Sequence, residues 1–164
     1  MRHLSHVSSP GNEALTVLFS KFKSTTEGSS KNVQTSCNLA IPVKVKKGYS
    51  VTIYKTEYRG YTFVPKKSKT KFKAEYTFAG QKGPTFKKTF KKTQFFYMDP
   101  KIRVVSSMDC GSDVTLRINT SLIAIKKKKK GQNPSINIDS IDLTSEEENN
   151  VAGEFKYYMK AEKC

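Results

Sequence analysis

Alternation between apolar and polar residues runs through most of this chain and limits its fold more than any other feature. In the stretch 71–78, KFKAEYTF, the apolar residues Phe72, Ala74, Tyr76 and Phe78 alternate with lysine, glutamate or threonine. Successive side chains of a β-strand point to opposite faces, so this period of two predicts strands with one buried and one solvated face. The same pattern recurs at residues 15–19, 39–53, 86–90, 114–124, 135–141 and 155–159.

Turn signals separate these stretches. Clusters of Gly, Pro and polar residues such as TEGSSKN, AGQKGP and SEEENN lie between them, and no stretch has the 3.6-residue period of a helix. We therefore expect an all-β protein, an antiparallel β-sandwich of jelly-roll or Greek-key type with no substantial helix. Residues 1–12 are polar and predict a flexible leader, which leaves residues 13–164 as a single sandwich domain. Pro42 has no amide hydrogen to donate, which predicts an edge strand or a bulge there.

Lysine dominates the charge of the chain. Lys and Arg total 30 against 14 Asp and Glu, a net charge of +16, but only four of the cations are arginines. Arginine offers a planar fork that binds phosphate or guanine bidentately, whereas lysine is a hydrated point charge. The composition therefore favours loose attraction to polyanions over specific readout, unless the lysines simply occupy solvated strand faces. Ten Phe and eight Tyr indicate a folded domain, because so many aromatic side chains are hard to leave exposed.

The longest charge run consists of Lys126, Lys127, Lys128, Lys129 and Lys130. One interpretation is a contact for phosphate, glycan or anionic lipid. The other is a solvated hairpin tip, since the run joins two alternating stretches and is followed by turn residues. Like charges repel one another and resist ordering, so a mobile loop is favoured. Such a loop remains a candidate for binding polyanions without sequence specificity.

An aromatic stretch, EYRGYTF, surrounds Arg59 with Tyr58 and Tyr61. These three residues are candidates for an aromatic binding patch, because a guanidinium stacks on neighbouring rings. Plain core packing competes with this interpretation and is favoured. Gly60 within a strand predicts either a bulge or a close approach of another part of the backbone.

Signals for an enzyme are nearly absent. Both histidines, His3 and His6, lie in the expected leader, and the three cysteines have no CxxC spacing. No P-loop, GxSxG or HExxH motif occurs. A cluster of acids is better explained as a solvated loop than as a catalytic pair, with calcium binding as a weaker alternative; its members are Asp139, Asp142, Glu146, Glu147 and Glu148. We expect no catalytic residue, no metal and no cofactor.

Targeting signals in the sequence are few. The tripeptide beginning at Asn119 is a glycosylation sequon on the outward face of its expected strand, and it is relevant only in a secreted protein. No stretch approaches the roughly 20 apolar residues that span a bilayer. The first residues contain no apolar core of a signal peptide.

Four landmarks occur in order: KNVQTSCNLAIPVKVKKGYSVTIYKTEYRGY, AEYTFAGQKGP, DCGSDVTLRINTSL and the terminal YYMKAEKC. Together they resemble a family of small secreted proteins of fungi and bacteria known as the domain of unknown function 4360. The resemblance covers roughly residues 14–164. It implies a signal peptide, an all-β fold and disulfides, but no known activity.

The chain departs from this family at its start, in its tail and in its charge. Family members begin with a signal peptide, a first strand and a Gly-Cys-Pro segment, where this chain has MRHLSHVSSP. Their tails contain Trp, which is absent here, and they are less basic. We therefore expect that an upstream segment with a fourth cysteine is missing. In the family pattern the lost strand would pair with the strand at 14–22, and the lost cysteine would lie near Cys37.

The resemblance then implies a disulfide between Cys110 and Cys164 and leaves Cys37 outside any disulfide. The bridge would close a loop of about 55 residues and contribute roughly 4 kcal/mol by chain entropy. A simple three-stranded meander over 112–163 would put the two cysteines at opposite ends. The pairing therefore requires a strand that changes sheets.

The favoured function is that of a secreted, non-enzymatic β-sandwich that acts at a cell surface, wall or matrix. Its lysine-rich face would bind anionic polysaccharide or an anionic lipid surface. An intracellular basic protein that binds nucleic acid non-specifically is the first alternative, supported by the net charge and weakened by the scarcity of arginine. A membrane-active, toxin-like protein is the second, although no amphipathic helix is present to insert.

Overall fold

The computed structural model describes residues 5–8, 14–18, 22–43, 47–78, 80–100, 104–105, 113–138 and 154–164. Regular structure in these ranges consists of strands and contains no helix. Accordingly, none of the described residues belongs to a helix that could cross a membrane. The strands are β1 (Ser5–Ser8), β2 (Ala14–Leu18), β3 (Lys23–Thr25), β4 (Asn32–Val43), β5 (Tyr49–Phe63), β6 (Ser68–Phe78), β7 (Gln81–Phe90), β8 (Gln94–Met98), β9 (Val104–Val105), β10 (Val114–Lys126), β11 (Ser135–Asn137) and β12 (Glu154–Lys163).

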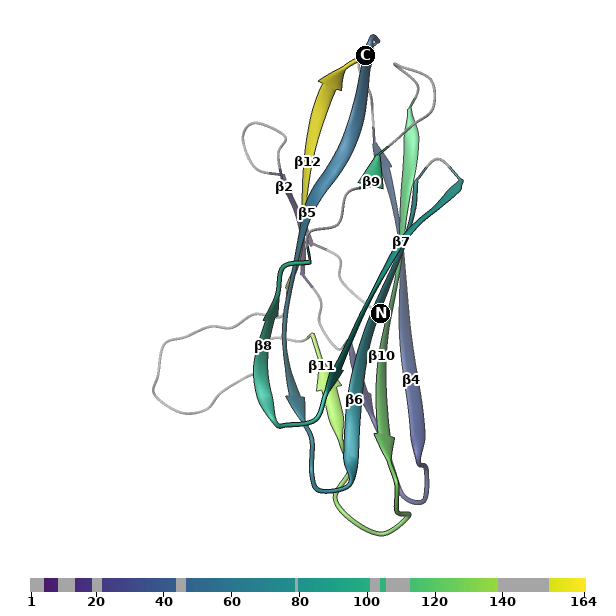
Figure 1. Ribbon diagram of the computed structural model, residues 1–164, viewed down its shortest axis with the longest axis vertical. Helices are drawn as coiled ribbons and strands as arrows, with labels where there is room; N and C mark the ends of the chain where they lie inside the picture. The colour runs from purple at the N-terminus through teal and green to yellow at the C-terminus, as the bar shows by residue number, and fades with distance from the viewer. Residues whose placement is uncertain are drawn as a thin grey trace.

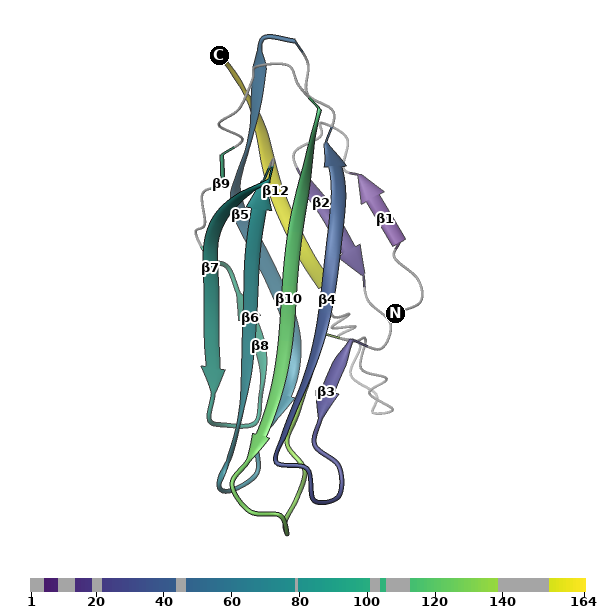
Figure 2. The same cartoon turned by 90° about the vertical axis from the view of Figure 1, so that its right-hand side faces the viewer.

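Two antiparallel sheets face each other (Figures 1 and 2). The larger sheet has the order β1-β2-β12-β5-β11-β3. Strands β12 and β11 pair with successive parts of one edge of β5, and β8 and β9 pair with its opposite edge. The smaller sheet has the order β4-β10-β6-β7. The predicted all-β, antiparallel sandwich is confirmed. Pro42 lies in β4, whose only sheet neighbour among the described strands is β10, so the predicted edge position is confirmed as well.

The core lies between the two sheets and follows the alternation of the sequence. On β6, Phe72, Ala74 and Tyr76 are buried, as the pattern predicts. Strand β10, beside β6 in the same sheet, adds the buried side chains of Leu116, Ile118, Leu122 and Ala124. The larger sheet opposite contributes Tyr58, Phe96, Met98, Ile136 and Ile138. Each large apolar side chain buried in this way contributes about 1.5–3 kcal/mol of transfer free energy. Strands with a single apolar face are sufficient to build this two-layer core.

The first strand corrects the prediction of a flexible leader over residues 1–12. Ser5–Ser8 form β1, which pairs antiparallel with β2 from Ser5 opposite Leu18 to Ser8 opposite Leu15. A strand of four residues is too short to give a readable alternation, and its pairing depends on backbone groups that any residue supplies. The upstream partner that β2 was expected to lack is thus β1. The sandwich begins before residue 13.

The chain changes sheets after β10. Strand β10 lies in the smaller sheet, whereas β11 and β12 lie in the larger sheet. The lysine run is therefore not the tip of a hairpin, as predicted, but part of a connection between the two layers. Because β12 runs back along β5, Cys164 lies at the end of the sandwich where β10 begins (Figure 2). Its amide donates to the Gly48 carbonyl at 2.9 Å, in the turn between β4 and β5.

Candidate functional site

Exposed lysines from distant parts of the sequence meet at one end of the sandwich. The turn after β5, the connection from β7 to β8 and the loop after β10 all lie there (Figure 1). The Lys127 amide donates to the Lys67 carbonyl at 3.0 Å, and the Val64 amide donates to Oγ1 of Thr93 at 2.9 Å. We call this set the lysine end; its exposed members are Lys31, Lys66, Lys67, Lys91, Lys92, Lys127, Lys128, Lys129 and Lys130.

The electrostatics of the lysine end are one-sided. Within the turns that the structure describes there, at residues 26–31, 64–67, 91–93 and 127–134, Glu27 is the only acid. A surface with one sign of charge attracts ligands of the other sign and raises their rate of association. The exposed ammonium groups remain hydrated, so this attraction is weak per residue and screened by salt. The arrangement suits a polyanion that contacts several lysines at once.

Lys126 is not part of this exposed set, which corrects the predicted group of five. Its side chain is only 4% exposed, and its Nζ donates to the Gly28 carbonyl at 2.9 Å and to Oδ1 of Asn133 at 2.7 Å. The same Oδ1 accepts a hydrogen bond from Oγ1 of Thr26 at 3.1 Å. Lys126 therefore ties the loop to the turn after β3. The loop expected to be mobile is anchored at both ends, and its exposed lysines are Lys127 to Lys130.

Replacing Lys126 with methionine is expected to lower the free energy of unfolding by about 2 kcal/mol, because the charge-assisted hydrogen bonds of this buried side chain are lost. Methionine keeps the apolar stem but supplies no donor to Gly28 or Asn133. Urea unfolding followed by circular dichroism measures the difference. The matched control is Lys128→Met, which removes the same charge from an exposed position and should change stability by no more than about 0.5 kcal/mol. Equal midpoints for the two variants would contradict this role.

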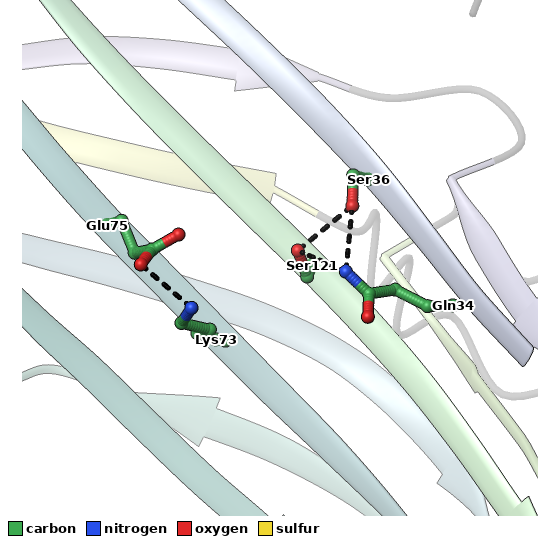
Figure 3. Close-up of polar contacts among 5 residues, drawn as sticks. All are labelled: Gln34, Ser36, Lys73, Glu75 and Ser121. Atoms are coloured by element: carbon green, nitrogen blue, oxygen red, sulfur yellow. Dashed lines mark hydrogen bonds and ion pairs between the residues drawn. The ribbon is translucent and has the colours of Figure 1, made fainter. Parts of the chain in front are cut away.

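The outer face of the smaller sheet is a second basic surface, here called the basic face. It presents polar and basic side chains, namely Lys69, Lys71, Lys73, Lys82, Lys87 and Arg117, with Gln34, Ser36, Asn38, Asn119 and Ser121. Among the described residues of the four strands, Glu75 is the only acid. Lys73 Nζ lies 2.7 Å from its carboxylate (Figure 3). This hydrogen bond, helped by Lys82 and Lys87, lowers the pKa of Glu75 below its usual value.

Hydrogen bonds between uncharged side chains hold the part of the basic face that lies on β4 and β10. The hydroxyls of Ser36 and Ser121 lie 3.0 Å apart across β4 and β10, and Nε2 of Gln34 donates to both (Figure 3). Asn119 is exposed on this face and lies between Asn38 and Glu75 in the register, so its predicted outward direction is confirmed. It lines a shallow pocket of about 360 Å³ together with Glu75, Lys82 and Arg117. Its glycosylation remains a prediction.

Tyr58 belongs to the core, so the predicted aromatic patch of Tyr58, Arg59 and Tyr61 is corrected. Tyr58 is fully buried, its hydroxyl is hydrogen-bonded to that of Tyr76, and its ring packs on Phe72 with centroids 4.7 Å apart. The Tyr76 hydroxyl also donates to Oγ1 of Thr56 at 3.3 Å. Burial raises the pKa of Tyr76 above its usual value, so its phenol stays protonated and serves the packing of the core.

Arg59 and Tyr61 point away from the core and meet two residues of β8 that sequence reasoning missed. The guanidinium of Arg59 lies 5.0 Å from the ring centroid of Tyr97, and the rings of Tyr61 and Phe95 are 4.9 Å apart. Arg59, Tyr61, Phe95 and Tyr97 are called the aromatic patch from here on. The signal was present in the sequence, because three consecutive aromatics in QFFYM cannot all point to one face of a strand.

Cys37 is the next predicted position whose side chain the structure describes. Cys37 carries a thiol and is fully buried, and burial raises its pKa to about 11, so it is a poor nucleophile. Cys110, His3 and the acids of 139–148 lie outside the described residues, and nothing is described of the His6 side chain. In the described part of the chain, no three His, Cys, Asp or Glu side chains gather as metal ligands would.

Comparison with known proteins identifies one family. The family described as domain of unknown function (DUF4360) matches residues 2–154, so the resemblance expected from the landmarks is confirmed. The match includes the residues of β1, upstream of the expected start at residue 14. No curated protein matches the chain.

Proposed function

The chain belongs to the family of the domain of unknown function (DUF4360), and we propose that it is a secreted, non-enzymatic β-sandwich that binds polyanions at a cell surface, wall or matrix. The ligand class is an anionic polysaccharide or, with the same chemistry, an anionic lipid surface. The observation that supports this most is the gathering of exposed lysines at the lysine end. The basic face adds a second surface of the same sign.

The lysine end suits a polymer better than a small anion. Its lysines come from separate turns and remain exposed, which suits contacts spread along a polymer. A lysine next to an anionic surface contributes about 1 kcal/mol. Several such contacts in parallel give useful affinity without a defined fork such as arginine provides. Binding of this kind falls steeply as salt is added.

Secretion is supported by the position of the terminal cysteine. We infer that Cys164 forms the disulfide that the family resemblance implies. Disulfides persist in oxidising compartments, which is why this favours an extracellular protein. The proposed partner, Cys110, lies outside the described residues, but the change of sheets after β10 meets the topological requirement for the pairing. Strand β10 begins at Val114, opposite Val43 at the end of β4, and Cys164 contacts the turn that follows β4.

Heparin chromatography tests the proposed function with two variants of equal charge. The first changes Lys127, Lys128, Lys129 and Lys130 to glutamine, and the second changes Lys69, Lys71, Lys82 and Lys87 of the basic face. The lysine-end variant is expected to bind heparin at least about tenfold more weakly than wild type, because four parallel contacts are lost. The charge-matched variant should lose less. Equal losses would mean that net charge alone acts, and no retention at low salt would exclude a polyanion role.

The same variants separate the possible ligands. Phosphatidylserine vesicles test the lipid surface, and double-stranded DNA of random sequence tests the nucleic-acid alternative. The proposal expects heparin to compete the protein away from both at low salt, because a polysaccharide with sulfate and carboxylate groups has the higher charge density. A preference for DNA over heparin would favour the intracellular alternative. Leakage of dye from the vesicles would favour the membrane-active one.

A further inference from the structure

Two aromatic side chains of the aromatic patch are half exposed. Phe95 is 49% exposed and Tyr97 is 50% exposed, and in the described part of the chain they are the large apolar side chains that face solvent. Leaving apolar surface in water costs about 25 cal/mol per Å². An apolar patch rimmed by polar groups on a soluble sheet is a typical sign of a binding site. The pair lies on β8, beside the lower half of β5 (Figure 1).

Contacts with β5 hold this patch in one arrangement. Tyr97 lies directly opposite Arg59 and donates from its hydroxyl to Oε1 of Glu57 at 2.7 Å. Phe95 lies opposite Tyr61 and contacts its ring. Glu57 is only 5% exposed, so the acceptor of the tyrosine hydroxyl is itself fixed. Side chains that are already ordered lose little conformational entropy when a ligand binds.

The shape of the patch indicates the form of its ligand. A shallow pocket of about 390 Å³ is lined by Arg59, Phe95, Phe96 and Tyr97. The Phe96 side chain is buried in the core, so the strand backbone forms the floor at that position. The flanking residues Phe95 and Tyr97 are two positions apart on one face, about 7 Å along the strand. A ring-shaped ligand would lie over both side chains at this spacing, beside the guanidinium of Arg59.

We propose that the aromatic patch is a saccharide site that takes a pyranose ring of a polysaccharide. A pyranose has an apolar face of C–H groups, which suits the rings of Phe95 and Tyr97, and a rim of oxygen atoms that accept hydrogen bonds. Arg59 supplies donors at the side of the pocket, where the ligand's rim would lie. This site goes beyond the proposed function, which rests on attraction between exposed lysines and a polyanion. The aromatic patch would instead bind by ring contacts and hydrogen bonds, and it does not include the lysine end.

Other occupants fit the patch less well. Insertion into lipid would bury the exposed guanidinium of Arg59, which lies over the Tyr97 ring, in hydrocarbon, which is costly. Strand β8, which carries Phe95 and Tyr97, also lies along β5 and not at a tip of the sandwich (Figure 1). A nucleobase would stack on the same rings, but its phosphodiester would bring a second negative charge near Glu57. These occupants are tested below as alternatives.

The site is tested by pull-down with insoluble chitin, cellulose and β-1,3-glucan in about 1 M NaCl, where the Debye length is about 3 Å and attraction between exposed charges is screened. Wild-type protein is expected to be retained by at least one of these neutral polysaccharides. The double variant Phe95→Ala/Tyr97→Ala should bind it at least about tenfold more weakly, since each ring contact contributes about 0.5–1.5 kcal/mol. Both side chains are exposed, so a melting temperature close to wild type shows that the variant folds.

Two further variants give the controls. The lysine-end variant should bind the neutral polysaccharide as wild type does and lose heparin, whereas the Phe95/Tyr97 double variant should do the reverse. Tyr97→Phe keeps the ring but removes its tether to Glu57, and an intermediate loss is expected. Retention of wild type by none of the three polysaccharides would overturn the saccharide site, as would equal retention of the double variant. A loss confined to single-stranded DNA or to vesicles would reassign the patch to a base or to lipid.

Discussion

Replacing Gly60 with alanine is expected to lower the free energy of unfolding by about 3 kcal/mol, because no space exists for a methyl group at this position. An added Cβ would overlap the main-chain oxygen of Asn137 on β11 and approach Cζ of Phe96 on β8 to 2.5 Å. Backbone oxygen cannot move without separating β5 from β11. The strands on both edges of β5 would therefore shift, and urea unfolding measures the loss.

A second glycine provides the control for this prediction. Gly28 has open space around its Cα but a φ of +52°. Gly28→Ala should therefore show only the penalty of a left-handed residue, about 1 kcal/mol. If the two alanine variants have similar midpoints, the close approach at Gly60 does not limit packing. Displacement of β8 would also disturb Phe95 and Tyr97, so Gly60→Ala should weaken binding of neutral polysaccharide.

Replacing Cys164 with serine is expected to lower the free energy of unfolding by about 4 kcal/mol, the chain entropy of a closed loop of about 55 residues. This prediction depends on the proposed bridge to Cys110. Without it, the end of β12 keeps its pairing with β5 and the backbone hydrogen bond from Cys164 to Gly48, but a chain end without a covalent link frays more readily. The measurement is denaturant unfolding of the variant and of wild type without reductant.

Mass spectrometry after alkylation checks the pairing directly. In denaturant without reductant, wild type is expected to take up a single alkyl group, at Cys37, and to take up three after reduction. Cys110→Ser should cost as much as Cys164→Ser, and the double variant no more than either, because all three remove the same bond. Three alkyl groups on unreduced wild type would disprove the bridge. Additive losses from the two single variants would also do so.

Much of the fold could be read from local pattern. The alternation identified the inward set of β6, Phe72, Ala74 and Tyr76, because a strand between water and a core must alternate. Pro42 predicted an edge strand or a bulge, since a missing donor is harmless only where no neighbour needs it, and the edge is what the structure has. Gly60 indicated a close approach, which Asn137 and Phe96 now explain. Each of these inferences required only the chemistry of a residue and its immediate neighbours.

The errors about the site have a common cause. Adjacency in sequence groups Lys126 with the lysines that follow it, but Lys126 continues the inward positions of β10, two residues after Ala124. Adjacency also groups Tyr58 with Arg59 and Tyr61, but neighbours on a strand face opposite ways. The importance of Phe95 and Tyr97 depends on their pairing with Arg59 and Tyr61 on another strand, which no local pattern shows.

By itself, the sequence determined which residues are buried and which are solvated along most strands, and it determined the excess of lysine and the family. These properties are local, since they depend on period, charge and residue type. Only the tertiary structure decided which turns meet at the lysine end, which sheet β12 joins, and which aromatic side chains are left exposed beside Arg59. Contacts of this kind join residues far apart in the chain, and the energy that selects them comes from closing both layers over one core.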